Sequence, residues 1–170
     1  MKKLVLCTLC IAVSQIAFAQ DSGKTLVNEL VKHWEASKSL SLEVAEAMPD
    51  ADFSFKATPP ERSFGGQMNH LAGGNAFYCS AALGTKSPLG KPADDTKATV
   101  IKSLNTAYDF CIDGLKGMTD EDLQKTATMH GNTVSKFELF WGGFTHAAHT
   151  RGQAEVYLRL KGVVPPEYKF

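Results

Sequence analysis

The sequence has no excess of charge of either sign. Its 170 residues contain 18 Lys and Arg and 18 Asp and Glu, which gives a formal net charge of +0. No segment concentrates basic residues. Because a nucleic-acid binder needs a cationic surface to neutralise phosphates, the sequence predicts no nucleic-acid partner.

Long hydrophobic runs are absent after the first residues. A membrane span needs about 20 consecutive apolar residues, and no segment beyond residue 19 approaches that length, so we predict no membrane anchor. The chain begins with Lys2 and Lys3, continues with a short apolar run and reaches Ala17-Phe18-Ala19. This order is typical of a secretory signal peptide over residues 1–19, so we expect residues 20–170 to be one exported domain, periplasmic or secreted.

Cysteine is scarce, and half of it lies in the expected leader. After residue 19 the chain keeps only Cys79 and Cys111. An even pair in an oxidising compartment favours a Cys79–Cys111 disulfide. The alternative is two buried free thiols on different helices.

Motifs for nucleophilic catalysis and phosphate binding are also missing. The sequence has no Gly-x-Ser-x-Gly element between a strand and a helix, and no phosphate-binding loop. If the protein is an enzyme, a metal ion is then expected to supply the chemistry.

Helical periodicity dominates what is present. Thr58-Pro59-Pro60-Glu61 has the order of a helix start, Thr119–Asp122 reads as a capping box that opens a short helical turn, and 126–132 reads as a polar loop. We find no convincing alternating strand pattern. The sequence therefore predicts an all-α fold, an antiparallel four-helix bundle in which the consecutive helices that carry Cys79 and Cys111 are antiparallel neighbours. The four predicted helices span about 24–48, 59–83, 94–117 and 133–161.

The last predicted helix has polar residues where a core is expected. Alternate steps of three and four define an apolar seam that is interrupted by three consecutive polar members, His146, His149 and Gln153. The remaining members of this seam are Leu139, Gly142, Val156 and Leu160. Burying the three polar side chains without partners would cost about 1–3 kcal/mol each, so they need a partner.

Histidines from two helices offer such a partner. His146 and His149 are three residues apart and share a helix face, and His70 on the second helix could converge with them. Three neutral imidazoles suit a divalent metal such as Zn²⁺ or Ni²⁺. Gln153 could hold the second nitrogen of an imidazole, or it could instead bond the second helix without touching metal. Arg151 is expected to pair with an acidic residue or a helix end.

These residues resemble the DinB-like superfamily of metal-binding four-helix bundles. The resemblance rests on His70 in the second helix, on the pattern His146-x-x-His149-Thr-Arg-Gly-Gln, and on the ending Tyr-Leu-Arg-Leu-Lys-Gly-x-x-Pro-Pro. It implies a divalent metal, often Zn²⁺ or Ni²⁺, held by one histidine of the second helix and two of the last. Many members place their third histidine where this chain has Thr150, so His149 would substitute for it.

The resemblance also implies a class of activity. Some DinB-like proteins are thiol-dependent transferases or isomerases that use the metal to activate a small thiol. We therefore expect either a metal-dependent hydrolase or thiol-dependent transferase acting on a small molecule, or a non-catalytic metal- or ligand-binding bundle. The sequence is compatible with a homodimer.

The leader gives the first testable prediction. Cleavage after Ala19 would make Gln20 the first residue of the exported protein, intact or cyclised. Mass spectrometry of protein recovered after export should show this terminus. An exported protein that still begins at Met1 would contradict the prediction.

Overall fold

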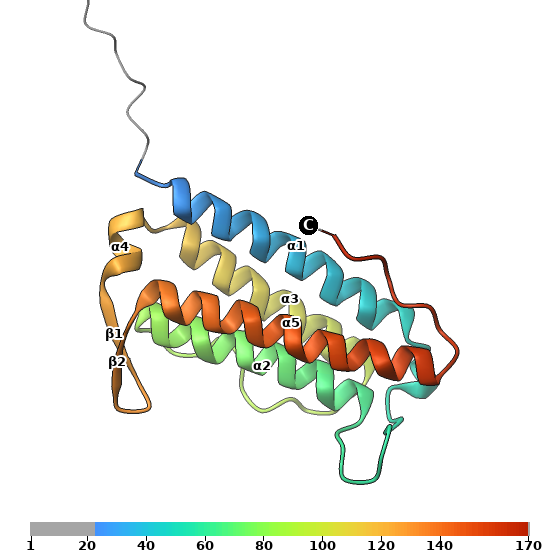
Figure 1. The fold of residues 1–170 in the computed structure, drawn as a ribbon. Helices are drawn as coiled ribbons and strands as arrows, with labels where there is room; N and C mark the ends of the chain where they lie inside the picture. Colours follow the sequence, from blue (N-terminus) through green and yellow to red (C-terminus); the bar gives the residue numbers. More distant parts are fainter. Residues whose placement is uncertain (1–22, 170) are drawn as a thin grey trace, which may run out of the picture.

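The computed structural model describes residues 23–169, so the expected leader and its cleavage site lie outside the described part. Four long helices lie side by side and account for most of it (Figure 1). Their bounds are Thr25–Ala47 for α1, Phe64–Leu83 for α2, Lys97–Lys116 for α3 and Lys136–Leu160 for α5. The predicted all-α bundle is confirmed. Within residues 23–169, no helix is long and apolar enough to cross a membrane.

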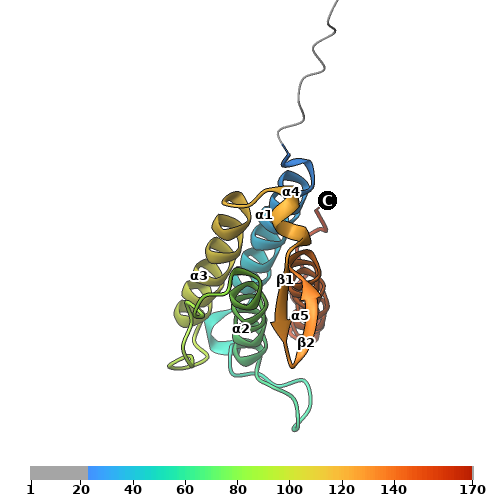
Figure 2. The ribbon, with the colours of Figure 1, turned by 90° about the vertical axis from the view of Figure 1, so that its left-hand side faces the viewer.

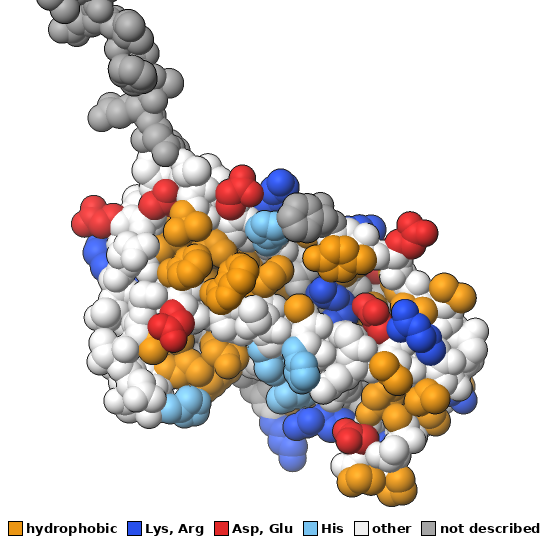
Figure 3. Space-filling model, viewed as in Figure 1, with side chains coloured by type: hydrophobic (Ala, Val, Ile, Leu, Met, Phe, Trp, Pro, Cys, Tyr) orange, Lys and Arg blue, Asp and Glu red, His pale blue; other side chains and the backbone are white. Residues whose placement is uncertain are grey.

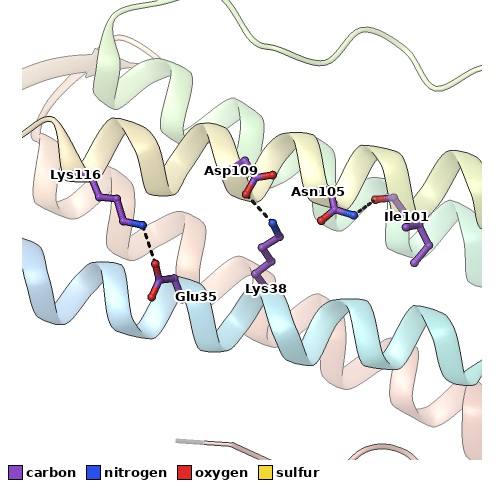
Figure 4. Close-up of polar contacts among 6 residues, drawn as sticks. All are labelled: Glu35, Lys38, Ile101, Asn105, Asp109 and Lys116. Carbon is purple, nitrogen blue, oxygen red and sulfur yellow. Dashed lines mark hydrogen bonds and ion pairs between the residues drawn. The ribbon is translucent and has the colours of Figure 1, made fainter.

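Seen along the bundle, each long helix has two neighbours (Figure 2). α2 packs between α3 and α5, and α1 completes the ring by packing against the same two helices. The core between them is apolar and includes Trp34, Phe64, Tyr108 and Phe140, each with 0% of its surface exposed. Two ion pairs also join α1 to α3, Lys38 with Asp109 and Lys116 with Glu35 (Figure 4).

The helices α2 and α3 run in the same direction, so the expectation that they are antiparallel neighbours is wrong. Gly65 near the start of α2 lies against Asp95 just before α3, and Leu83 at the end of α2 packs against Gly114 near the end of α3. The segment 84–96 crosses back along the bundle. Thirteen extended residues reach about 43 Å, more than the about 30 Å length of a 20-residue helix. Both helices are antiparallel to α1 and α5.

The second helix begins later than predicted. α2 starts after Ser63, whose hydroxyl accepts the backbone N–H of Gly66 at 3.0 Å. The segment before α2 supplies acceptors for the first two backbone N–H groups of the helix. Phe64 and Gly65 donate to the carbonyls of Phe55 and Phe53. Pro59 itself precedes a proline, which disfavours helical torsions at that residue. The helix start expected at Thr58-Pro59-Pro60-Glu61 is therefore wrong.

Two short elements join α3 to α5. The predicted capping box at Thr119 is confirmed: Thr119 and Asp122 cap each other reciprocally at the start of α4 (Asp120–Gln124). The expected loop over 126–132 is instead part of a hairpin, in which β1 (Thr126–Met129) pairs antiparallel with β2 (Asn132–Ser135). His130 and Gly131 form the tight turn of this hairpin, with φ angles of 50° and 79°.

A short 3-10 helix, η1 (Asp50–Asp52), lies elsewhere in the chain and follows α1.

The predicted disulfide is present. Cys79 of α2 and Cys111 of α3 are bonded, with their Cα atoms 5.5 Å apart. The bond clamps the parallel pair α2 and α3, which no short loop connects. Its two cysteines are 32 residues apart in sequence, so it closes a loop that contains the whole crossover.

Reducing this bond should destabilise the protein substantially. Loop-closure entropy for a loop of this size predicts a loss of about 3–4 kcal/mol in the free energy of unfolding. Urea unfolding with and without reductant measures the loss. The double variant Cys79→Ala, Cys111→Ala is the matched control, because reductant should leave its stability unchanged. Free thiols found by labelling the unfolded, unreduced wild type would contradict the prediction.

Candidate functional site

The face that α5 buries differs from the predicted seam. Val156 and Leu160 of that seam are 50% and 57% exposed. His146 is half-buried, and His149 and Gln153 are exposed. The seam is therefore wrong by about one helix position. The buried residues of α5 are Leu139, Phe140, Gly143, Ala147, Thr150, Arg151, Ala154, Tyr157 and Leu158.

The structure brings His70 of α2 and His146 of α5 into contact. Their Nε2 atoms lie 3.3 Å apart, and their rings meet edge to face with centroids 5.0 Å apart. Two imidazole nitrogens bound to one tetrahedral Zn²⁺ at about 2.0–2.1 Å are separated by about 3.3–3.4 Å. The pair therefore already has the spacing of two ligands of one ion.

Gly74 makes this contact possible. A Cβ atom at Gly74 would lie 2.2 Å from Cε1 and 2.4 Å from Nδ1 of His146, so the imidazole occupies the space that any other residue would fill. Neighbouring Gly73 meets nothing within 4 Å. The Nδ1 atom of His146 is buried on this side and has no hydrogen-bond partner.

The third candidate ligand belongs to an adjoining polar chain. His149 Nε2 lies 3.0 Å from Gln153 Nε2, and Gln153 Oε1 accepts a 2.5 Å hydrogen bond from Gln67 Nε2 of α2. Because the oxygen of Gln153 accepts the hydrogen bond from Gln67, the amide NH2 group of Gln153 faces His149 and donates to it. Gln153 thus bonds the second helix, which was one of the two alternatives considered for it, and it also donates to His149; its support of a metal-bound imidazole stays a prediction.

The structure brings two of the three expected ligands, His70 and His146, close enough to bind one ion. Within residues 23–169, no group of three or more His, Cys, Asp or Glu side chains is arranged to hold a metal ion. His149 is turned toward Gln153, although it sits one helical turn from His146 on the same side of α5. The chemistry of the donor set fits a divalent metal if His149 exchanges its bond to Gln153 for the ion.

The surroundings of both paired imidazoles favour their neutral form. Burial lowers the pKa of His146, and the nearby His70, His149 and Arg62 lower it further. Burial and the charge of Arg62 also lower the pKa of His70. The lone pairs needed for metal binding therefore persist to a lower pH than those of free imidazoles.

Two surface hollows lie at the site, one lined by His70 and the other by Gln153, the hydrogen-bond partner of His149. One, of about 450 Å³, is lined by His70 together with Lys56, Arg62 and Asn69. The other, of about 280 Å³, contains Gln67 and Gln153. Larger hollows exist elsewhere, including one of about 640 Å³ between α2 and β1, but it contains no histidine. Figure 3 shows histidine side chains exposed in the middle of one face, with Lys and Arg side chains close by.

Sequence reasoning missed two residues of the site. Gln67 is 3% exposed and lies three residues before His70, a spacing that places both on one side of α2. Arg62 precedes the helix, and no pattern singled it out. Of the other histidines, His130 is exposed. His33 lies against Phe144, with ring centroids 6.0 Å apart.

Comparison with known proteins identifies the family to which the fold belongs. A family model described as the DinB family matches residues 20–170. The chain belongs to the DinB family. No curated protein sequence matches it.

Two solved DinB-like proteins share the fold. One from Bacillus cereus has 17% sequence identity and a TM-score of 0.73, and the alignment covers 84% of this chain and 97% of that protein. One from Bacillus subtilis has 22% identity and a TM-score of 0.71, with 84% and 98% of the two chains covered. At these identities the likeness establishes the DinB fold and leaves the chemistry to the site itself.

The contact between Gly74 and His146 can be tested with two adjacent variants. Gly73→Ala should raise the free energy of unfolding by about 0.5–1 kcal/mol, because alanine favours the helix and its Cβ meets nothing. Gly74→Ala should show a smaller gain or a loss, since the His146 ring must move. Urea unfolding measures stability, and histidine NMR resonances report the ring. Equal gains with unchanged His146 resonances would contradict this account.

Proposed function

We propose that this DinB-family protein is an exported, metal-dependent enzyme that acts on a small molecule. His70, His146 and His149 would bind one divalent ion, Zn²⁺ or Ni²⁺. The observation that carries the proposal is the 3.3 Å separation of two imidazole nitrogens from facing helices. The cystine bond supports export, because structural disulfides persist in oxidising compartments.

When the ion binds, His149 would exchange its hydrogen bond to Gln153 for a bond to the metal. His149 would release Gln153 and turn toward the pair, while Gln153 would remain bonded to Gln67. A ligand that must first break a hydrogen bond binds more weakly than a preformed one. The polar chain therefore sets the metal affinity and holds His149 in the metal-free protein.

A bound ion would supply Lewis acidity, either by polarising a substrate oxygen or by lowering the pKa of a bound water or thiol. Three neutral histidines leave its charge uncompensated, which favours an anionic substrate or an ionised nucleophile. Arg62 lies close enough to lower the pKa of both His70 and His146. It can orient a negatively charged substrate group beside them. These features fit a hydrolase or a thiol-dependent transferase.

A second candidate is a metal- or ligand-binding bundle without catalysis. It is favoured by Thr150, which is buried where many relatives are expected to carry the third ligand, and by the engagement of His149 with Gln153. Metal binding would be weak or absent in that case.

Thermal unfolding of metal-free protein with and without Zn²⁺ or Ni²⁺ tests the site. Metal should raise Tm, because it binds the folded state preferentially, and at 100 times its Kd the stabilisation is about 2.7 kcal/mol. The rise should disappear in His70→Ala and in His149→Ala. It should weaken as the pH falls and the imidazoles protonate, and the lowered pKa values of His70 and His146 place that loss at a lower pH than for free imidazoles.

His130→Ala is the matched control, since this histidine is exposed in the hairpin turn and should leave the metal response intact. A response lost only in His70→Ala would mean that His149 is no ligand. If metal leaves the Tm of the wild type unchanged, the hydrogen-bonded histidines form a metal-free polar network and the enzyme proposal fails.

A further inference from the structure

A second polar cluster lies inside the bundle, away from the paired histidines. Arg151 of α5 is only 6% exposed. Its Nη1 donates to Ser37 Oγ at 3.0 Å and lies 3.5 Å from Ser41 Oγ, both on α1. The Tyr108 hydroxyl of α3 bonds both serines, at 2.9 and 2.8 Å. Three helices thus hold one guanidinium in place.

No carboxylate neutralises this guanidinium within residues 23–169. Arg151 was expected to pair with an acidic residue or a helix end, but it takes part in none of the ion pairs of the described residues. Serine and tyrosine hydroxyls supply lone pairs without negative charge. A guanidinium keeps its charge at physiological pH, so the cluster carries a largely buried positive charge with no counter-charge among residues 23–169, which is unfavourable.

The guanidinium borders a small cavity that could admit such a counter-charge. The space is about 20 Å³, and its lining includes Arg151, Ser37, His33 and Lys169. None of the described residues that line it is acidic. Lys169 is itself neutralised by an ion pair with Glu43, so Arg151 supplies the net charge. Both hydrogen bonds that the guanidinium makes within the described part of the chain come from Nη1, so Nε and Nη2 are the groups that would donate to an occupant.

The size of the cavity restricts the occupant. A water molecule needs about 10–15 Å³ of such space, so this cavity has room for one small species. We propose that it is a binding site for a single monovalent anion of about the size of chloride, held by the Arg151 guanidinium and the Ser37 hydroxyl. The anion completes the core between α1, α3 and α5. This site is independent of the proposed metal centre.

Thermal unfolding of the metal-free, disulfide-bonded protein tests the site. In this experiment sodium chloride replaces sodium gluconate at constant ionic strength. Gluconate is the reference anion because it is too large to enter the cavity. Above the chloride Kd, each tenfold increase in chloride should raise Tm by about 3–5 °C. Chloride-35 NMR provides a direct second measurement: the wild type should broaden the chloride resonance in excess of bulk, and added bromide should reverse the excess.

Arg151→Met keeps the apolar stem and removes the charge, so it should abolish both responses. Arg159→Met is the matched control: the same substitution eight residues later on α5, at an exposed arginine beside Glu155, should leave both responses intact. A wild type that shows neither the Tm dependence nor the excess broadening overturns the proposal. It is equally overturned if Arg151→Met retains the broadening of the wild type. The NMR arm requires only wild-type protein, so a variant that fails to fold leaves the test decisive.

Discussion

The close approach of α2 and α5 at Gly74 is the constraint on which the candidate site depends. The His146 imidazole fills the volume of the missing side chain and thereby reaches His70. The two helices run antiparallel, so the contact is repeated along their length by Gln67 with Gln153 and by Tyr157, whose hydroxyl donates to the carbonyl of Arg62. A glycine inside a helix costs about 1 kcal/mol relative to alanine. Here that cost permits two imidazoles from separate helices to meet.

The sequence predicted the bundle well because its signals are local or strongly periodic. The helix ranges, the capping box at Thr119 and the cysteine pair follow from spacing and from the chemistry of single residues. The short hairpin was missed because its strands have four residues each and its turn is His130-Gly131 instead of the more familiar Asn-Gly. The direction of α3 depends on a crossover that no local pattern encodes.

The candidate site was predicted in its residues but not in its placement. A helix with histidines, glycines and alanines on adjacent faces gives a weak periodic signal, so the predicted seam was rotated by about one position. The actual core face of α5 contains Gly143, Ala147 and Ala154, small residues that let neighbouring helices approach. The histidines consequently line the edge of the interface with α2, where an ion or substrate can reach them.

The parallel arrangement of α2 and α3 has an electrostatic consequence. Two parallel helices present their N-terminal ends, each with a partial positive charge, at the same end of the bundle. Asp94 and Asp95 lie there: Asp94 bonds the hydroxyl and backbone N–H of Thr96, which caps α3, and Asp95 accepts from Ser63, which caps α2. The two carboxylates thus offset a pair of aligned helix dipoles. In an antiparallel pair the two N-termini would lie at opposite ends of the bundle, so the crossover that makes the helices parallel also brings both N-termini within reach of two adjacent acids.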